Sequence, residues 1–187
     1  MAGESETRLL ERAANGDEAA FRRLFEAHHA ALFRLAWRLT GAVDAAEDIT
    51  QECFLRLVRQ PRFDDALGSL RHYLFGMVRN LARQRWQQSG REIAWDDDAD
   101  EAAPCADAVL SAEVSDAVQA AIAALPPLQR EAIVLFEFEE LSLEETASVA
   151  GSDVGTVKSR LCRARERLRR SLAPYREKGT AYGSAER

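Results

Sequence analysis

The fold of the C-terminal half is decided by residues 142–170, SLEETASVAGSDVGTVKSRLCRARERLRR. Ser142 and Glu145 have the spacing of a Ser-x-x-Glu capping box, which predicts the start of a short helix that ends at Gly151. A second helix is predicted from about Asp153 to about Leu172. Its apolar positions recur at helical spacing and form one stripe: Val154, Val157, Leu161, Ala164 and Leu168. A capped short helix, a turn with glycine and a longer helix together predict a helix-turn-helix.

The side of the last helix opposite this stripe is polar and basic. It carries Thr156, Lys158, Ser159, Arg160, Arg163 and Arg167. Hydroxyls, lysine and arginine at the start of such a helix can meet base edges in the major groove, whereas arginines farther along suit phosphates. The alternative is a basic, solvated face on an ordinary helix. The capping box, the glycine turn and the apolar stripe together favour DNA binding.

The rest of the chain also has helical periodicity. Helices are predicted after Asp17 up to Gly41, from about Asp44 to Pro61, and over residues 68–88, 112–124 and 128–138. No strand alternation appears in the sequence. We therefore expect an all-α fold made of two small helical domains joined by an acidic flexible linker.

The net charge conceals a strong segregation of charge along the chain. The 187 residues include 25 Lys+Arg and 31 Asp+Glu, a formal net charge of −6 that by itself argues against nucleic-acid binding. Residues 66–91 have a net charge of +5 and residues 156–178 of +7, whereas residues 92–116 hold nine acids and no base. Because charge acts within about one Debye length, roughly 8 Å at physiological salt, each basic block can bind phosphates locally.

The acidic block predicts the domain boundaries. Residues 92–116 contain few large apolar side chains, so we expect a flexible, charge-extended linker there. It separates a domain over residues 1–91 from the helix-turn-helix domain over residues 117–175, which a tail over residues 176–187 follows. Each domain is near the lower size limit for independent folding.

A second constellation lies in residues 70–88, LRHYLFGMVRNLARQRWQQ. Arginines without a single acid alternate there with Tyr73, Phe75 and Trp86. This composition suits a single-stranded nucleic acid, with arginines on the phosphates and bases stacked on the rings. The alternative is an amphipathic helix whose aromatic rings belong to the core, since Tyr73 and Phe75 flank the core position Leu74.

Features of enzymes, metal sites and exported proteins are missing from the sequence. Cys53, Cys105 and Cys162 lack the spacing of a disulfide framework or a zinc site, and no Gly-rich phosphate loop or Ser/His/Asp constellation appears. No stretch approaches the roughly 20 apolar residues that span a bilayer, and the N-terminus lacks a signal-peptide core. We expect a cytoplasmic protein with no membrane insertion, no cofactor, no bound metal and no catalytic chemistry.

With these motifs in view, the chain resembles the ECF (extracytoplasmic-function) sigma factors of bacterial RNA polymerase over roughly residues 8–172. The segments LPPLQREAIVLFEFEELSLEETASVAG (125–151) and VGTVKSRLCRARERLRR (154–170) resemble the family's promoter-binding domain. DAAEDITQECFLRLV (44–58) is similar to the segment that docks on the polymerase, and LFGMVRNLARQRW (74–86) to the segment that melts the minus-ten element. Glu140 stands where the family commonly has glycine.

The resemblance implies a set of contacts for this chain. The polymerase contacts would be Asp48, Gln51, Glu52 and Leu55, and the minus-ten contacts Asp64, Asp65, Arg79, Asn80, Arg83 and Trp86. The loop over residues 64–69 would take a flipped minus-ten base, and the basic face of the last helix would bind the minus-thirty-five element. The implied partners are core RNA polymerase, through the clamp helices of its largest subunit and its flap, promoter DNA, and an anti-sigma factor.

Two other functions compete with that of a sigma factor. A stand-alone helix-turn-helix regulator that binds DNA as a dimer would explain residues 117–172 but would leave residues 8–91 without a task. An enzyme has no positive feature in its favour. An apolar dimerisation seam outside the predicted helices would favour the regulator, and the sequence has none.

Overall fold

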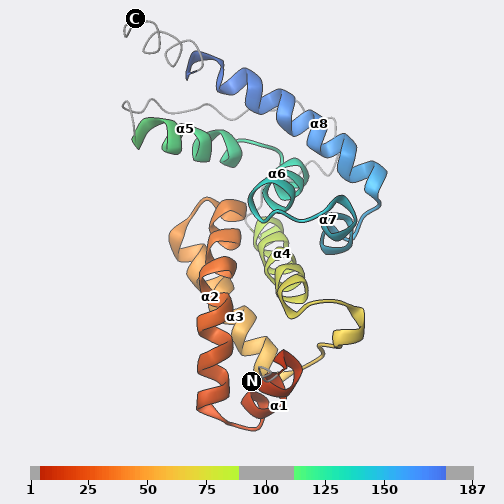
Figure 1. Cartoon of the computed structure of the whole chain (residues 1–187). Coiled ribbons are helices and arrows are strands. Elements are labelled where there is room, and N and C mark those ends of the chain that lie inside the picture. Colours follow the sequence, from red (N-terminus) through yellow and green to blue (C-terminus); the bar gives the residue numbers. More distant parts are fainter. Residues whose placement is uncertain (1–4, 89–111, 176–187) are drawn as a thin grey trace, which may run out of the picture.

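The computed structural model describes residues 5–88 and 112–175, and the regular elements of these two ranges are all helical (Figure 1). The first range contains α1 (Glu6–Ala14), α2 (Glu18–Thr40), α3 (Val43–Arg59), a 3₁₀ turn η1 (Asp65–Leu67) and α4 (Leu70–Gln88). The second contains α5 (Ala112–Ala123), α6 (Pro127–Ile133), a π-helical turn η2 (Val134–Phe138), α7 (Leu143–Ala150) and α8 (Val154–Ser171). The predicted all-α class is confirmed. Of the predicted linker, residues 92–111 lie outside the described residues and 112–116 begin α5; the tail 176–187 also lies outside them.

The helix ends follow the sequence signals closely. Asp17 caps α2, and its carboxylate accepts the backbone N–H groups of Ala19 and Ala20 at 3.0 Å each. Gly41 ends the helix in the left-handed conformation, with φ at 74°. Helix α1 was not predicted, because its nine residues are fewer than the window in which helical periodicity can be recognised.

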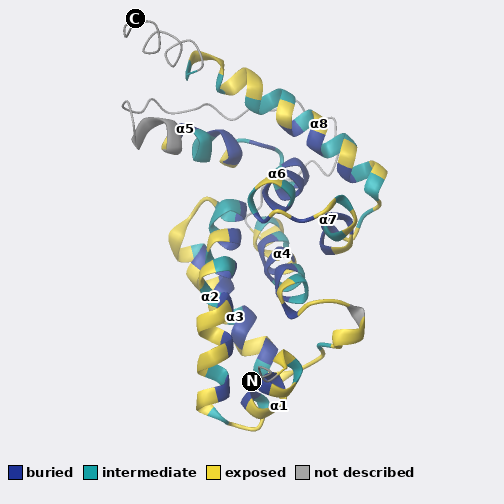
Figure 2. Ribbon diagram, in the orientation of Figure 1, coloured by how far each residue is buried: buried dark blue, intermediate teal, exposed yellow. Residues whose placement is uncertain are grey.

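The N-terminal helices bury leucine-rich faces against one another (Figure 2). Helix α2 packs on α1, α3 and α4, and the side chains at the centre of this packing are fully buried. They include Leu24, Leu32, Leu35, Leu39, Leu57, Leu70, Leu74 and Phe75. The burial of Phe75 decides for that ring the alternative left open by the sequence: it belongs to the core.

The two halves of the chain pack on each other in this structure. Helix α2 contacts α5, α6 and η2, and α4 contacts α7, so that the buried apolar residues of both halves form one continuous cluster. A Cβ placed on Gly41, at the end of α2, would lie 3.7 Å from the Cβ of Ala123 in α5. The two helical domains therefore share a core, an arrangement we call the closed form.

The turn before the capping box has an unusual backbone. Glu140 adopts a left-handed conformation with φ at 56°, and it is the one non-glycine residue with positive φ in the described ranges. A side chain in this conformation brings its Cβ close to a carbonyl oxygen, at a cost of roughly 1–2 kcal/mol. This geometry explains why glycine suits the position.

Candidate nucleic-acid interface

The predicted helix-turn-helix is present as α7, a turn at Gly151 and α8 (Figure 1). Both halves of the capping box form: the N–H of Glu145 donates to the Ser142 hydroxyl at 3.2 Å, and the Glu145 carboxylate accepts the Ser142 N–H at 2.8 Å. Gly151 turns the chain with φ at 58°, where glycine meets no steric cost. The buried stripe of α8 consists of Val157, Leu161 and Ala164.

The first turn of α8 holds its polar side chains by local hydrogen bonds. Asp153 caps the helix and accepts both the N–H of Thr156 at 2.8 Å and its hydroxyl at 2.6 Å, which keeps the pKa of Asp153 below its usual value. The Ser159 hydroxyl donates to the Thr156 carbonyl at 3.0 Å. Lys158, which stands between these two residues in the sequence, is exposed. Of these predicted base-contacting residues, Lys158 presents its charge to solvent, while Thr156 and Ser159 use their hydroxyls within the helix.

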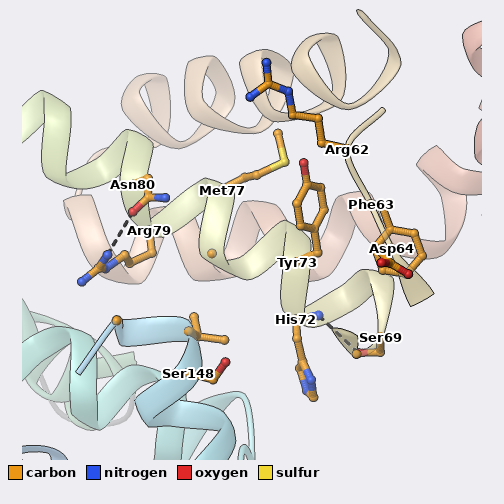
Figure 3. Close-up of a pocket in the computed structure, with 14 residues that line it drawn as sticks. Arg62, Phe63, Asp64, Ser69, His72, Tyr73, Met77, Arg79, Asn80 and Ser148 are labelled. Carbon is orange, nitrogen blue, oxygen red and sulfur yellow. Dashed lines mark hydrogen bonds between the residues drawn. The ribbon is translucent and has the colours of Figure 1, made fainter. Parts of the chain in front are cut away.

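The predicted minus-ten loop and α4 border a cavity of about 440 Å³ (Figure 3). One wall comes from the loop around Asp64 and Ser69, and another from Tyr73, Met77 and Asn80 of α4, as Figure 3 shows. A third comes from the helix-turn-helix, through Ser148, Val149 and Gly151. The cavity thus lies between the two halves of the chain.

The two acids of this loop have different partners. Asp64 accepts the N–H of Ala66 at 3.0 Å and so caps the 3₁₀ turn η1. Asp65 accepts the Thr7 hydroxyl at 3.0 Å, which ties the loop to α1. Both predicted loop residues are exposed, and their hydrogen bonds stabilise the loop itself.

Arg79 is the predicted DNA contact that the structure places most differently. Its side chain is only 11% exposed, and its Nε lies 3.1 Å from Oε2 of Glu131, a carboxylate that is fully buried. Its Nη2 donates to the carbonyl of Ala150, at the end of α7, and its Nη1 donates to the Asn80 side chain at 3.0 Å. In the closed form, Arg79 therefore binds the helix-turn-helix and is withheld from solvent.

The other predicted minus-ten residues follow α4 toward its end. Asn80 is exposed, and Arg83 and Trp86 are half-buried. The guanidinium of Arg130, from α6, lies 5.8 Å from the centre of the Trp86 ring, within range of a cation–π interaction. The structure therefore brings Arg79, Asn80, Arg83 and Trp86 together on α4, with α6 and α7 packed against three of them.

Two buried acids, which the sequence analysis did not single out, join the halves. Burial raises the pKa of Glu131, and the charges of Arg79, Arg83 and Arg160 oppose this shift. The Nε of Arg79 is close to Oε2, yet neither carboxylate oxygen of Glu131 has a well-aligned hydrogen bond among the described residues. The contact is thus an ion pair with imperfect hydrogen-bond geometry.

Glu139 makes the second connection. Its carboxylate is 3% exposed and pairs with Arg38 of α2 at 3.1 Å and with Arg71 of α4 at 3.3 Å. Burial raises the pKa of Glu139, and the two arginines oppose that shift. For Glu131, the sequence did contain a signal of burial, since this acid stands in the apolar run around Ala132 and Ile133.

The predicted polymerase-binding residues lie together on α3 beside the end of α4. Asp48 pairs with Arg85 at 2.9 Å and Glu52 with Arg56 at 2.6 Å. Gln51 and Leu55 are exposed, and Leu55 is 39% exposed. A hollow of about 490 Å³ is lined by all four predicted residues and by residues of α4.

An aromatic cluster that the sequence analysis missed continues this surface. The ring centres of Phe25 and Phe54 are 4.9 Å apart, and Phe21 lies 6.2 Å from Phe54. Phe25 is 37% exposed, and an apolar hollow of about 340 Å³ is lined by Phe21, Phe54 and Leu55. Phe21 and Phe25 belong to a helical stripe that predicts core positions, so their partial exposure gave no signal in the sequence, and Phe54 is buried.

No helix in the described parts of the chain is long and apolar enough to cross a membrane.

Residues 24–92 match the family described as Sigma-70 region 2, and residues 115–168 match Sigma-70, region 4. The chain is 33% identical over 171 residues to the ECF RNA polymerase sigma factor SigW of Bacillus subtilis, covering 84% of this chain and 91% of that protein. It is 34% identical over 171 residues to the ECF RNA polymerase sigma factor SigM of Mycobacterium tuberculosis, covering 90% and 85% of the two chains.

Solved structures give the same likeness. The sigma factor RpoE in complex with the anti-sigma factor NepR from Bartonella quintana matches with a TM-score of 0.64 and 30% identity, over 82% of this chain and 96% of that one. CnrH in complex with the cytosolic domain of CnrY matches with a TM-score of 0.66 and 25% identity, over 91% and 99%.

Proposed function

The chain belongs to the ECF sigma factors, the promoter-specificity subunits of bacterial RNA polymerase in transcription initiation, and from this premise we propose which of its surfaces do the work. Helix α8 reads the minus-thirty-five element in the major groove, α4 and the loop before it bind the minus-ten element, and α3 docks on core polymerase. The match of residues 24–92 to sigma-70 region 2 gives the N-terminal half a task that a dimeric helix-turn-helix regulator would leave unfilled.

The assignment of α8 depends on three features together: a basic helix face, a buried apolar stripe behind it and a capped preceding helix. Lys158, near the N-terminus of α8, is exposed where a helix-turn-helix presents residues to the groove. Thr156 and Ser159 would exchange their local hydrogen bonds for bonds to bases. Arg163 and Arg167, one and two turns farther along, would bind phosphates and set the position of the helix.

The minus-ten assignment depends on the cavity beside α4. Asp64, Tyr73 and Asn80 line the side of this cavity that belongs to the loop and α4, and their polar groups suit the edge of a flipped base. Arg79, Arg83 and Trp86 would follow the strand beyond it by phosphate contacts and stacking. The side of the cavity formed by α7 would have to move away first.

The closed form cannot serve both promoter elements at once. Elements about 25 base pairs apart lie about 85 Å from each other along B-form DNA, at 3.4 Å per base pair. In the closed form, Arg79 of α4 instead pairs with Glu131 of α6 at 3.1 Å and donates to the carbonyl of Ala150 at the end of α7. The two halves would therefore separate when the protein works on polymerase.

The docking surface for polymerase is the hollow on α3. Asp48 and Glu52 are acids whose partners, Arg85 and Arg56, are exposed at the protein surface, so basic groups of the clamp helices could replace them at low cost. Leu55 would supply an apolar contact. We assign no catalytic step to the chain itself and place its action in the cytoplasm. We also assign it an anti-sigma factor as a regulatory partner, as in the solved complex of RpoE with the anti-sigma factor NepR.

The test of this proposal is footprinting of the reconstituted holoenzyme on a responsive promoter. Lys158→Ala should weaken protection at the minus-thirty-five element and reduce the salt dependence of binding by about one phosphate charge or lose base preference there. Arg170→Ala is the matched control, since it removes the same charge from the last turn of α8, where Arg170 is 73% exposed and paired with Glu166. Equal effects of both substitutions would contradict the assignment.

A further inference from the structure

Arg79, an arginine assigned to promoter DNA, pairs with a carboxylate of the protein itself, that of Glu131. Arg79 and Arg83 come from α4, Arg160 comes from α8, and Glu131 lies on α6, which packs on α8. Arg79 is 3.1 Å from this carboxylate, and all three arginines act on it by charge. Carboxylate and phosphate oxygens offer guanidinium groups the same kind of acceptor. Glu131 therefore occupies, in Arg79, a cation that DNA would need.

The position of Arg79 adds a steric element to this electrostatic one. Its guanidinium donates to the carbonyl of Ala150, at the C-terminal end of α7, where the helix dipole favours a cation. A Cβ on Gly151 would lie 3.7 Å from its Nη1, so the side chain is seated against the turn of the helix-turn-helix. Ser148 and Val149 of the same helix close one wall of the cavity beside α4.

We propose that Glu131 is an autoinhibitory latch: in the closed form it pairs with Arg79 and keeps this arginine away from DNA until the two halves separate. The inference rests on the function proposed above and extends it to the free protein. While the latch is closed, the minus-ten surface of α4 and the turn of the helix-turn-helix cover each other. Separation exposes both at the same time.

The latch is built to open. The Glu131 carboxylate is fully buried, so its ion pair with Arg79 must offset a large desolvation cost, and buried ion pairs often offset such a cost only in part. Phosphate oxygens of DNA and basic groups of polymerase can thus compete for the same partners. The imperfect geometry is consistent with a contact that must break each time the protein is used.

The first test replaces the carboxylate and measures DNA binding by the free, full-length chain. Glu131→Gln should bind a fluorescein-labelled single-stranded oligonucleotide about tenfold more tightly than the original protein at the same salt concentration, because the closed form loses its ion pair. Glu144→Gln is the matched control: it removes the same charge from α7, where Glu144 is exposed. An unchanged affinity of Glu131→Gln, or an equal gain in Glu144→Gln, would overturn the proposal.

The second test locks the closed form with a disulfide. Gly41 and Ala123 place their β-carbon positions 3.7 Å apart, within the range that a disulfide requires. The variant combines Gly41→Cys and Ala123→Cys with Cys105→Ser and Cys162→Ser. Cys53 can stay, because burial raises the pKa of its thiol to about 12 and keeps it unreactive.

The locked protein is compared with itself after reduction, so any strain from a side chain at position 41 is the same in both samples. The oxidised sample should bind the oligonucleotide about tenfold less tightly than the reduced one. Adding Glu131→Gln should slow formation of the disulfide, because the halves spend less time together. Equal affinities of the two samples, or an unchanged rate of disulfide formation, would overturn the latch. These measurements use no polymerase. If the protein failed to direct transcription, that result would refute the proposed function, and the measurements of oligonucleotide binding would still decide whether the latch exists.

Discussion

Replacing Arg79 by alanine leaves the Glu131 carboxylate buried without the guanidinium that lies 3.1 Å from it. The Arg79 side chain is 11% exposed and that of Glu131 is fully buried, so water cannot compensate for the loss. Breaking a buried pair on one side typically costs about 3–5 kcal/mol, and we expect a loss of about 3 kcal/mol in the free energy of unfolding. If the two halves separate, water can reach the unpaired Glu131 carboxylate. The free energy of that separation therefore sets an upper limit on the loss in the free energy of unfolding.

The matched control is Arg71→Ala, on the same helix. Arg71 also pairs across the halves, with Glu139 at 3.3 Å, but its side chain is 47% exposed and Glu139 keeps Arg38 as a partner. We expect this substitution to cost no more than about 1 kcal/mol. Urea unfolding of the full chain, followed by circular dichroism, measures both losses. The difference between the two variants is the quantity that tests the burial argument.

The same experiment at several pH values tests the charge on Glu131. Burial raises its pKa above the ordinary value of 4.5, and Arg79 on α4, Arg83 on α4 and Arg160 on α8 oppose this shift, so removal of Arg79 should raise the pKa further. A carboxyl group whose pKa is raised on folding stabilises the fold at pH values below its unfolded-state pKa, where it is protonated. This stabilisation is lost as the pH rises through the folded-state pKa. The loss in Arg79→Ala should therefore shrink from neutral pH toward acid. Equal losses in the two variants, or a gap that widens toward acid, would refute the reasoning.

Four further predictions follow from local features of the fold. Glu140→Gly should raise the free energy of unfolding by about 1 kcal/mol, because it relieves the left-handed backbone at φ 56°, whereas Glu140→Ala should bring no such gain. Ser142→Ala should lower it by about 1 kcal/mol through loss of the capping box, and an unchanged value would mean that the cap contributes nothing. Leu135→Ala should lower it by about 2–5 kcal/mol, since Leu135 is fully buried in the core, and a loss below that of a surface leucine would contradict its placement. Hydrogen bonds from Thr156 lower the pKa of Asp153 below its ordinary value of 3.8, so the ionised carboxylate stabilises the fold above pH 3.8, and this contribution is lost as the pH falls through the lowered pKa. Asp153→Asn should therefore make the free energy of unfolding depend less on pH in the acid range. An unchanged pH dependence would argue against the cap.

The local structure could be predicted from the sequence because its signals are short-range. Asp17, Ser142 and Asp153 cap helices where capping residues predict them, and Gly41 and Gly151 end helices in the left-handed conformation. Each of these signals involves residues within a few positions of one another. Helix α1 was missed since nine residues give too little periodicity.

The packing between the halves could not be predicted in the same way. Arg79 and Glu131 are residue types that are rarely buried, and nothing near either one in the sequence specifies the other as its partner. An acidic stretch between two basic blocks predicts two separate domains as readily as two domains that pack on each other. The sequence predicts a basic segment over residues 66–91, and in the structure Arg71 and Arg79 of this segment pair with Glu139 and Glu131 of the second half.

The central claim, that this chain selects promoters for RNA polymerase through α8 and α4, is tested most directly by transcription from a randomised promoter library. Core polymerase is reconstituted with the full chain, and the initiated transcripts are sequenced. The account predicts transcripts that start downstream of two recurring elements about 25 base pairs apart, with the upstream element's consensus relaxed in Lys158→Ala. Transcripts identical to those of core polymerase alone, or no association with core, would contradict it.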